Sequence, residues 1–367
     1  MSLTVQRDAL LSIVRNVTSV VEARNTIPIL SNMLIEADGG RVQVAGTDLD
    51  VQVRAGCEGE GLLSITVPAG KLQAALDSLK PGVVKMELVA DKGALAIKQG
   101  RSTRTLPTLP VADFPELPVT NAATRFVMPA RTFERLFETV QAAQSSEEAR
   151  YYLKGVFLHV VGDKLVSAAC DGHRLLRCEV DLPDDAAGMP DMIVSSKTIG
   201  LLRKLVAGGD ADVTIEAGRD RIVVAAGPLR ITAKLVAATY PDYQRTIPSG
   251  GANVLTAGRN ALIATAQAAS AISGEKVRSL RIELTHGAEP EFITRDGMGA
   301  HAVEPLPGEY AGAQMAVGIN AKYLISLASS FHEASVLRFE LGEPSHPIRI
   351  SAEAEPDLVA VCMPMRA

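Results

Sequence analysis

One compact group of residues in the chain could in principle hold a metal ion or act as a nucleophile: Cys170, Asp171, His173 and Cys178. A structural zinc site takes four ligands, whereas this group supplies three thiol and imidazole ligands and no partner pair lies nearby. A thiol and an imidazole so close along a tight turn would lack an orienting third group. We therefore expect no catalytic residue, no metal site and no cofactor, and we interpret Asp171-Gly172 as a hairpin turn.

The composition is that of a soluble globular protein. The chain has 367 residues, of which 47% are hydrophobic, so it can bury a large apolar core. No apolar run approaches the roughly 18 residues that span a bilayer, and the opening MSLTVQRDAL lacks a signal-peptide core. The four cysteines form no CxxC pair, which favours reduced thiols. We expect a cytoplasmic protein.

A set of markers recurs three times along the chain. An Asp-led turn closes a strand-like run at spacings of 123 and 125 residues, and a lysine opens a predicted helix after each turn. The motifs FPELP and YPDYQ, at Phe114 and Tyr240, lie 126 residues apart. The aspartates are Asp48, Asp171 and Asp296, and the lysines are Lys71, Lys197 and Lys322.

These markers predict an α+β protein of three tandem domains, each with two helices and several antiparallel strands. Clusters of Pro, Gly, Asn and Ser place the domains at residues 1–120, 125–249 and 250–367. Apolar residues spaced i, i+3, i+4, i+7, beginning at Leu10 and again at Phe133, predict the first helix of the first two domains. The predicted helices are 4–20, 69–80, 130–143, 195–205, 257–272 and 320–331.

The charge is distributed unevenly between these helices and the rest of the chain. The six predicted helices carry +7, and the chain as a whole carries −5, which leaves −12 for everything else. A basic helical surface on an acidic protein would attract phosphates without reading base sequence. The pattern therefore favours contact with phosphates that is independent of base sequence, although basic residues on solvated helix faces would give a similar count.

Several motifs together resemble the bacterial DNA polymerase III beta subunit family, the sliding clamps. RYYLKG, DGHRL, YPDYQR and MPMR lie at 150–155, 171–175, 240–245 and 363–366. NTIPIL and TLPVADFPELP, at 25–30 and 108–118, resemble the first domain of that family. The resemblance implies a ring-forming homodimer of the DNA clamp fold, with helices lining the pore, that encircles duplex DNA. It also implies a noncatalytic processivity factor that tethers the polymerase III alpha subunit, clamp-loader subunits and other proteins with clamp-binding motifs.

The resemblance implies three sets of functional residues. A partner-peptide pocket between the second and third domains would comprise Arg150, Leu153, Cys170, Asp171, Gly172, His173, Arg174, Leu175, Pro241, Arg245, Thr246, Val277, Asn320, Tyr323, Met363, Pro364, Met365 and Arg366. The DNA-facing residues would be Arg24, Lys71, Lys80, Tyr151, Tyr152, Lys197, Arg203 and Lys204. The dimer interface would include Arg101, Arg104, Leu106 and Ile272, with Val277 beside them.

Three positions depart from the family pattern. Cys170 stands where Thr is usual, Thr246 where Val is usual and Val277 where an aromatic residue is usual, so partner preference could differ. The two tyrosines of RYYLKG could instead pack at a strand edge. Two other functions stay open at this point: a hydrolase or transferase built on the Cys170 cluster, and a repeat scaffold that binds peptides but never DNA.

Overall fold

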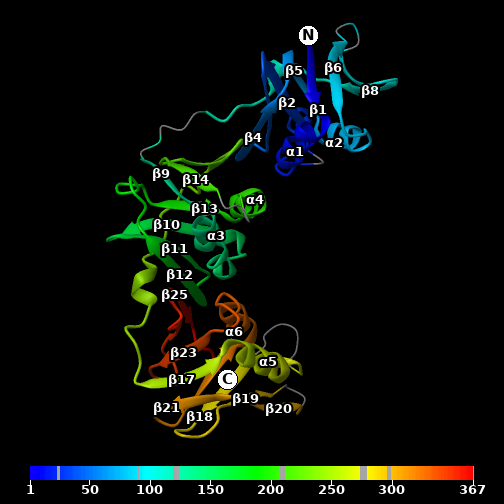
Figure 1. The fold of residues 1–367 in the computed structure, drawn as a ribbon. Coiled ribbons are helices and arrows are strands. Elements are labelled where there is room, and N and C mark those ends of the chain that lie inside the picture. Colours follow the sequence, from blue (N-terminus) through cyan, green and yellow to red (C-terminus); the bar gives the residue numbers. More distant parts are fainter. Residues whose placement is uncertain are drawn as a thin grey trace. The chain divides into compact units, whose positions relative to one another are not determined.

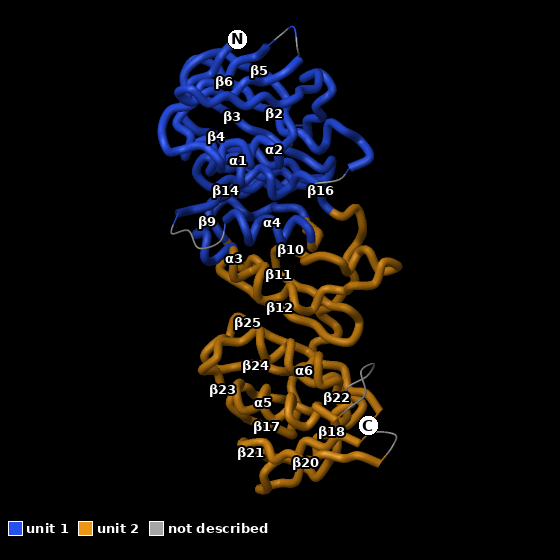
Figure 2. The backbone as a smooth tube through the Cα atoms, turned by 90° about the vertical axis from the view of Figure 1, so that its right-hand side faces the viewer, with its two compact units in different colours: residues 1–133, 183–190, 197–235 blue, residues 134–182, 191–196, 236–367 orange. Residues whose placement is uncertain are grey.

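The computed structural model describes residues 1–22, 25–89, 91, 93–118, 122, 124–206, 211–272, 279–295 and 299–366. The chain divides into two compact units, each treated by itself (Figure 2). Unit 1 comprises residues 1–133, 183–190 and 197–235, and unit 2 comprises residues 134–182, 191–196 and 236–367. In the part of the chain that is described, no helix is both long and apolar enough to cross a membrane.

Unit 1 contains a twelve-stranded antiparallel sheet in the order β8-β7-β6-β1-β5-β2-β3-β4-β16-β15-β14-β9. Its strands are β1 (Ser2–Gln6), β2 (Asn32–Asp38), β3 (Arg41–Thr47), β4 (Val51–Glu58), β5 (Glu60–Pro68), β6 (Val83–Val89), β7 (Ala94–Gln99), β8 (Ser102–Pro107), β9 (Thr124–Pro129), β14 (Asp212–Ala217), β15 (Arg221–Ala226) and β16 (Leu229–Lys234). Helices α1 (Arg7–Thr18) and α2 (Ala69–Asp77) lie side by side, joined by an Arg15–Asp77 ion pair of 2.6 Å (Figure 1). Helix α4 (Ser196–Val206) lies mostly in this unit.

Unit 2 contains a nine-stranded sheet, β13-β10-β11-β12-β25-β24-β23-β17-β21, and a four-stranded sheet, β20-β19-β18-β22. The strands are β10 (Gly155–Val161), β11 (Lys164–Cys170), β12 (Arg174–Asp181), β13 (Met192–Ser195), β17 (Asn253–Gly258), β18 (Ser279–Leu284), β19 (Glu291–Arg295), β20 (His301–Pro305), β21 (Gly308–Ala311), β22 (Met315–Asn320), β23 (Val336–Leu341), β24 (Ile348–Ala352) and β25 (Glu355–Cys362). Helices α5 (Arg259–Ser270) and α6 (Ala321–Ala328) lie side by side (Figure 1), and α3 (Ala130–Glu138) contains the boundary between the units.

The element order repeats three times along the chain. A strand and a helix are followed by four strands, a second helix and three strands; in the third copy the fourth strand is divided into β21 and β22. Strand pairing joins successive copies in the same way: β4 of the first copy pairs with β16 of the second, and β12 of the second pairs with β25 of the third.

The helix periods match the buried faces. Leu10, Ile13, Val14 and Val17 are all buried on α1, as their spacing predicts. The predicted start of this helix at residue 4 was wrong, because Ser2–Gln6 forms strand β1, which pairs with β5 and β6, and the helix begins at Arg7. The remaining predicted helices are present with ends that differ by a few residues, as expected where helix ends fray.

Candidate functional site

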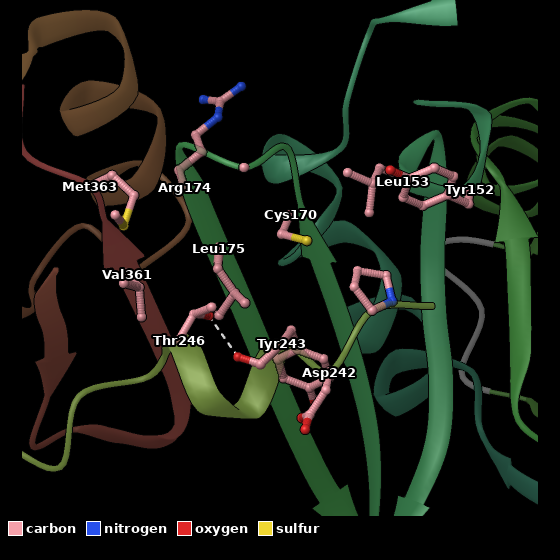
Figure 3. Close-up of a pocket in the computed structure, with 12 residues that line it drawn as sticks. Tyr152, Leu153, Cys170, Arg174, Leu175, Asp242, Tyr243, Thr246, Val361 and Met363 are labelled. Atoms are coloured by element: carbon pink, nitrogen blue, oxygen red, sulfur yellow. Dashed lines mark hydrogen bonds between the residues drawn. The ribbon is translucent and has the colours of Figure 1, made fainter. Parts of the chain in front are cut away.

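A cavity of about 250 Å³ opens in unit 2 where the 3-10 helix Glu148–Leu153, β11, β12, β25 and the segment after Tyr240 meet (Figure 3). Eight of the predicted pocket residues line it: Leu153, Cys170, Gly172, Arg174, Leu175, Pro241, Thr246 and Met363. Four lining residues were not predicted for the pocket: Tyr152, Asp242, Tyr243 and Val361. Tyr152 was instead predicted to face DNA. The floor is apolar, since Leu153, Leu175 and Val361 belong to one buried cluster.

The turn after β11 shapes one rim of this cavity. The Asp171 carboxylate accepts the backbone N–H groups of His173 and Arg174 at 2.9 and 3.0 Å, and its second oxygen accepts the Arg174 Nε–H at 3.0 Å. Gly172 has φ +89°, a conformation that disfavours residues with a side chain. The Arg150 guanidinium donates to the Asp171 carbonyl at 3.0 Å. Arg150 and Asp171 therefore hold the rim and do not line the cavity.

The predicted residues from α6 lie against the same turn. The ring of Tyr323 stacks on His173 with centroids 5.9 Å apart, and the Arg174 guanidinium lies 4.7 Å from the centre of the Tyr323 ring. Asn320 caps α6 by accepting the N–H of Lys322 at 2.9 Å. These contacts order the rim by stacking and capping.

The C-terminal tail separates this cavity from a second one of about 360 Å³. The Met363 N–H donates to the His173 carbonyl and the Met365 N–H to the Gly318 carbonyl, both at 2.8 Å. Pro364, Met365 and Arg366 line the second cavity, with Arg281, Ala316, Gly318, Pro344 and Ser345. The structure thus does not bring the last three predicted pocket residues into the first cavity.

One further pocket prediction, Arg245, falls outside the cavity wall. The side chain of Arg245 is 86% exposed and pairs with Asp242 at 2.7 Å. Val277 lies outside the residues that the structure describes.

The side chains of the suspected reactive cluster contact different partners. The Cys170 thiol lies 3.4 Å from the Tyr240 hydroxyl, whereas the His173 ring stacks on Tyr323. Burial raises the pKa of the Cys170 thiol, and it raises the pKa of Cys178 to about 12, which disfavours a thiolate at either position. Cys170 therefore acts as pocket lining, at the base of the rim (Figure 3).

The residues expected to face DNA differ in exposure and in ion pairing. Lys71, Lys80 and Lys204 are exposed, Tyr151 is 55% exposed, and Arg203 is half-buried. Lys197 forms ion pairs within unit 1: its ammonium lies 2.5 Å from the buried Asp48 carboxylate and 3.2 Å from Glu22. Arg24 lies outside the described residues.

The expected interface residues of unit 1 lie at the edge of its sheet. Strand β8 ends the twelve-stranded sheet, with Arg101 exposed in the turn before it and Leu106 buried. Arg104 is half-buried and donates from Nε to the Ser78 hydroxyl at 2.9 Å. Ile272, after α5 in unit 2, is 39% exposed.

Three family models together match most of the chain. They describe the N-terminal, central and C-terminal domains of the DNA polymerase III beta subunit and match residues 1–118, 127–242 and 244–366. The chain belongs to this family. The beta sliding clamp of Caulobacter vibrioides strain NA1000 is 34% identical over 378 residues, with 100% of each chain covered.

Solved structures of beta clamps agree with this assignment. The Caulobacter crescentus polymerase III beta structure superimposes with a TM-score of 0.94 at 33% identity, over 100% of both chains. A Bartonella birtlesii clamp, solved bound to griselimycin, matches with a TM-score of 0.93 at 34% identity, again over 100% of both chains. The predicted α+β fold of three tandem clamp domains and the predicted noncatalytic sliding-clamp function are confirmed.

The residues that sequence reasoning missed had a partial signal. Asp242 and Tyr243 lie within the YPDYQR motif, of which only Pro241 and Arg245 were assigned to the pocket. Val361 pairs with Leu175 across β25 and β12, a contact that needs the register of two distant strands. No local pattern could have supplied that register.

Proposed function

We propose that two copies of this chain close head to tail into a ring around duplex DNA, and that the cavity in unit 2 takes an apolar segment of a partner protein. The repeated strand pairing carries the ring proposal. Strand β4 pairs with β16, and β12 pairs with β25. The equivalent strand of the third copy is β20, and the equivalent last strand of the first copy is β8. Each is the edge of its sheet, and an open edge favours pairing with another chain.

The two existing junctions also give a register for the proposed pairing. Val53 pairs with Ile231 at one junction and Leu176 with Ala360 at the other. Counting from the hairpins that flank these strands, the equivalent pair is Ala302 of one copy and Arg104 of the other. The side chain of Glu304, two residues further on β20, would then lie diagonally across from Arg104, within reach of an ion pair.

The cavity supports the partner proposal through its chemistry. Its apolar floor can receive one or two aliphatic or aromatic side chains, and the ordered polar rim can orient the backbone that carries them. We propose as occupants the short clamp-binding segments of the polymerase III alpha subunit, clamp-loader subunits and other proteins with such motifs.

We further propose the domain limits 1–120, 125–249 and 250–367. We also propose a cytoplasmic location, where DNA replication takes place.

Retention on DNA tests the ring. Protein loaded by a clamp loader onto a nicked circular plasmid should stay bound through gel filtration at about 0.5 M salt, a concentration that screens its contacts with phosphates. It should leave when the plasmid is cut once. Equal loss from circular and linear DNA would contradict encirclement and favour a peptide-binding scaffold. A hydrolytic activity that is lost in His173→Ala while peptide binding stays normal would favour an enzyme.

A further inference from the structure

The wall of the cavity formed by the segment from Tyr240 to Tyr243 is held at both ends by a tyrosine hydroxyl. The Tyr240 hydroxyl accepts the backbone N–H of Cys170, on β11, at 3.0 Å. The Tyr243 hydroxyl lies 3.1 Å from Nε2 of His159, on β10. The two residues between the tyrosines line the cavity, as does Tyr243 itself. The position of this wall therefore depends on two hydrogen bonds to neighbouring strands.

His159 is buried behind this wall and does not line the cavity. Its side chain is 6% exposed, and its ring stacks on Phe157 with centroids 4.3 Å apart and planes at 18°. No hydrogen-bond partner for His159 Nδ1 is found among the described residues, so the bond to Tyr243 is the one polar contact recorded for this ring there.

Burial, together with a nearby charged group, keeps the His159 ring neutral. Burial, followed by the nearby Arg177 guanidinium, lowers the pKa of His159 to about 4. Arg177 is paired with Glu179 at 2.6 Å and, like Gln244, also hydrogen bonds to the Tyr243 hydroxyl, whose pKa is raised by burial. At neutral pH the ring and the hydroxyl thus form an uncharged hydrogen bond.

The Tyr243 anchor extends to another part of the cavity. Thr246 lines the cavity, and its hydroxyl donates to the Tyr243 carbonyl at 2.6 Å (Figure 3). A displaced Tyr243 would therefore move residues on both sides of itself. The ring of Tyr243 is also edge-on to Phe157 at 6.4 Å, so the anchor combines packing with the hydrogen bond.

We infer that His159 is a positioning residue of the partner-binding cavity: without touching a bound segment, it fixes the Tyr243 hydroxyl and with it the wall that the partner's apolar side chain must meet. This inference rests on the proposed function of the cavity. It predicts that binding depends on the hydrogen-bonding capacity of residue 159, because the apolar floor is formed by other residues.

The test measures the affinity of a fluorescein-labelled hexapeptide with adjacent leucine and phenylalanine residues, by anisotropy, for four variants. His159→Leu and Tyr243→Phe should each weaken binding about three- to tenfold, the equivalent of one lost hydrogen bond. His159→Gln should bind within about threefold of the wild type, because its amide can still reach the hydroxyl. The double variant H159L/Y243F should bind no more weakly than Tyr243→Phe alone, because the loss of the hydroxyl already removes the bond to His159.

The outcomes separate this inference from the proposed function. Fold losses that multiply in the double variant, or wild-type affinity in Tyr243→Phe, would overturn the role of His159. If H159L fails to fold, Tyr243→Phe compared with His159→Gln decides the matter. Failure of the wild-type protein to bind the hexapeptide, together with failure to bind labelled griselimycin, would instead contradict the proposed function of the cavity.

Discussion

Burial, more than residue type, decides what the ionisable side chains of the central domain can do. Cys170, Cys178 and His159 are all residues that sequence reasoning associates with chemistry. In the structure burial raises the pKa of both thiols and lowers the pKa of the imidazole, so all three are kept uncharged at neutral pH. They serve packing and positioning.

The depressed pKa of His159 makes stability depend on pH in a defined window. The unfolded chain binds a proton near pH 6.5, whereas the folded chain resists it until about pH 4. The contribution of the neutral ring is therefore complete above pH 6.5 and is lost as the pH falls toward 4. We expect the stability advantage of the wild type over His159→Gln to shrink by about 2 kcal/mol between pH 7.5 and 4.5, measured by urea unfolding.

The comparison with His159→Gln removes the contribution of other titrating groups, because they are common to both proteins. An advantage that is the same at both pH values would mean that the folded-state pKa of His159 is not depressed. An advantage that grows toward low pH would mean that it is raised.

At the scale of elements, one charged network ties α3 to the strand pair that carries the cavity. The Arg135 guanidinium of α3 donates to Asp357 on β25 at 2.7 and 3.0 Å and to Glu355 at 3.4 Å. Glu355 in turn accepts the N–H of His332 at 2.8 Å and the hydroxyl of Ser335 at 2.7 Å. The network thus fixes β25 at the end of its pairing with β12 that is remote from the cavity.

Removing Arg135 should destabilise the protein because it leaves the largely buried Glu355 carboxylate without its cation. We expect Arg135→Met to lower the free energy of unfolding by about 1–3 kcal/mol, less than for a fully buried pair since Arg135 is partly exposed. Urea midpoints check this. Arg245→Met is the matched control: its exposed pair with Asp242 should contribute less than about 0.5 kcal/mol. Equal midpoints for the two variants would contradict the network's role.

The turns show how far element-level prediction reaches. The Asp48 and Asp171 turns use the same device, since each carboxylate accepts the N–H groups two and three residues ahead. Asp-Gly predicted the second turn, whereas the first places Leu49 at φ +79°, where propensity would not put it. Periodicity predicted the helices and the threefold repeat, but it could not supply the β12–β25 register that brings Leu175 beside Val361.

Charge assignments made from sequence also reach a limit at this scale. From the sequence, a lysine in the first turn of α4 is predicted to be free to contact a phosphate. In the structure Lys197 is paired with Asp48 and Glu22, two carboxylates more than 140 residues away in the chain. Such pairing depends on strands β4 and β16 bringing the two segments together within unit 1. Long-range contacts therefore set which basic residues can meet DNA.

At the scale of the whole molecule, the threefold repeat leaves a pairing unfulfilled in a single chain. Two junctions are made within the chain, and in the proposed ring the third joins β20 of one copy to β8 of the other. In that proposed pairing, the register carried over from the existing junctions would place Glu304 near Arg104 of the other copy. Both side chains are half-buried in the single chain, so a second copy would desolvate them further.

Reversing either charge should weaken the dimer, and reversing both should restore it. Glu304→Arg and Arg104→Glu each place like charges across the proposed strand pair, which we expect to raise the dimer dissociation constant at least about tenfold. A mixture of the two single variants should associate again, because both interfaces of the mixed dimer then pair opposite charges, and so should the doubly reversed protein. Sedimentation velocity at 0.1 M salt measures this, with Arg338→Glu, on β23 away from both edges, as the control. Dimers that survive both single reversals would place the interface on other strands, because no ion pair at β8 and β20 could then be essential to it.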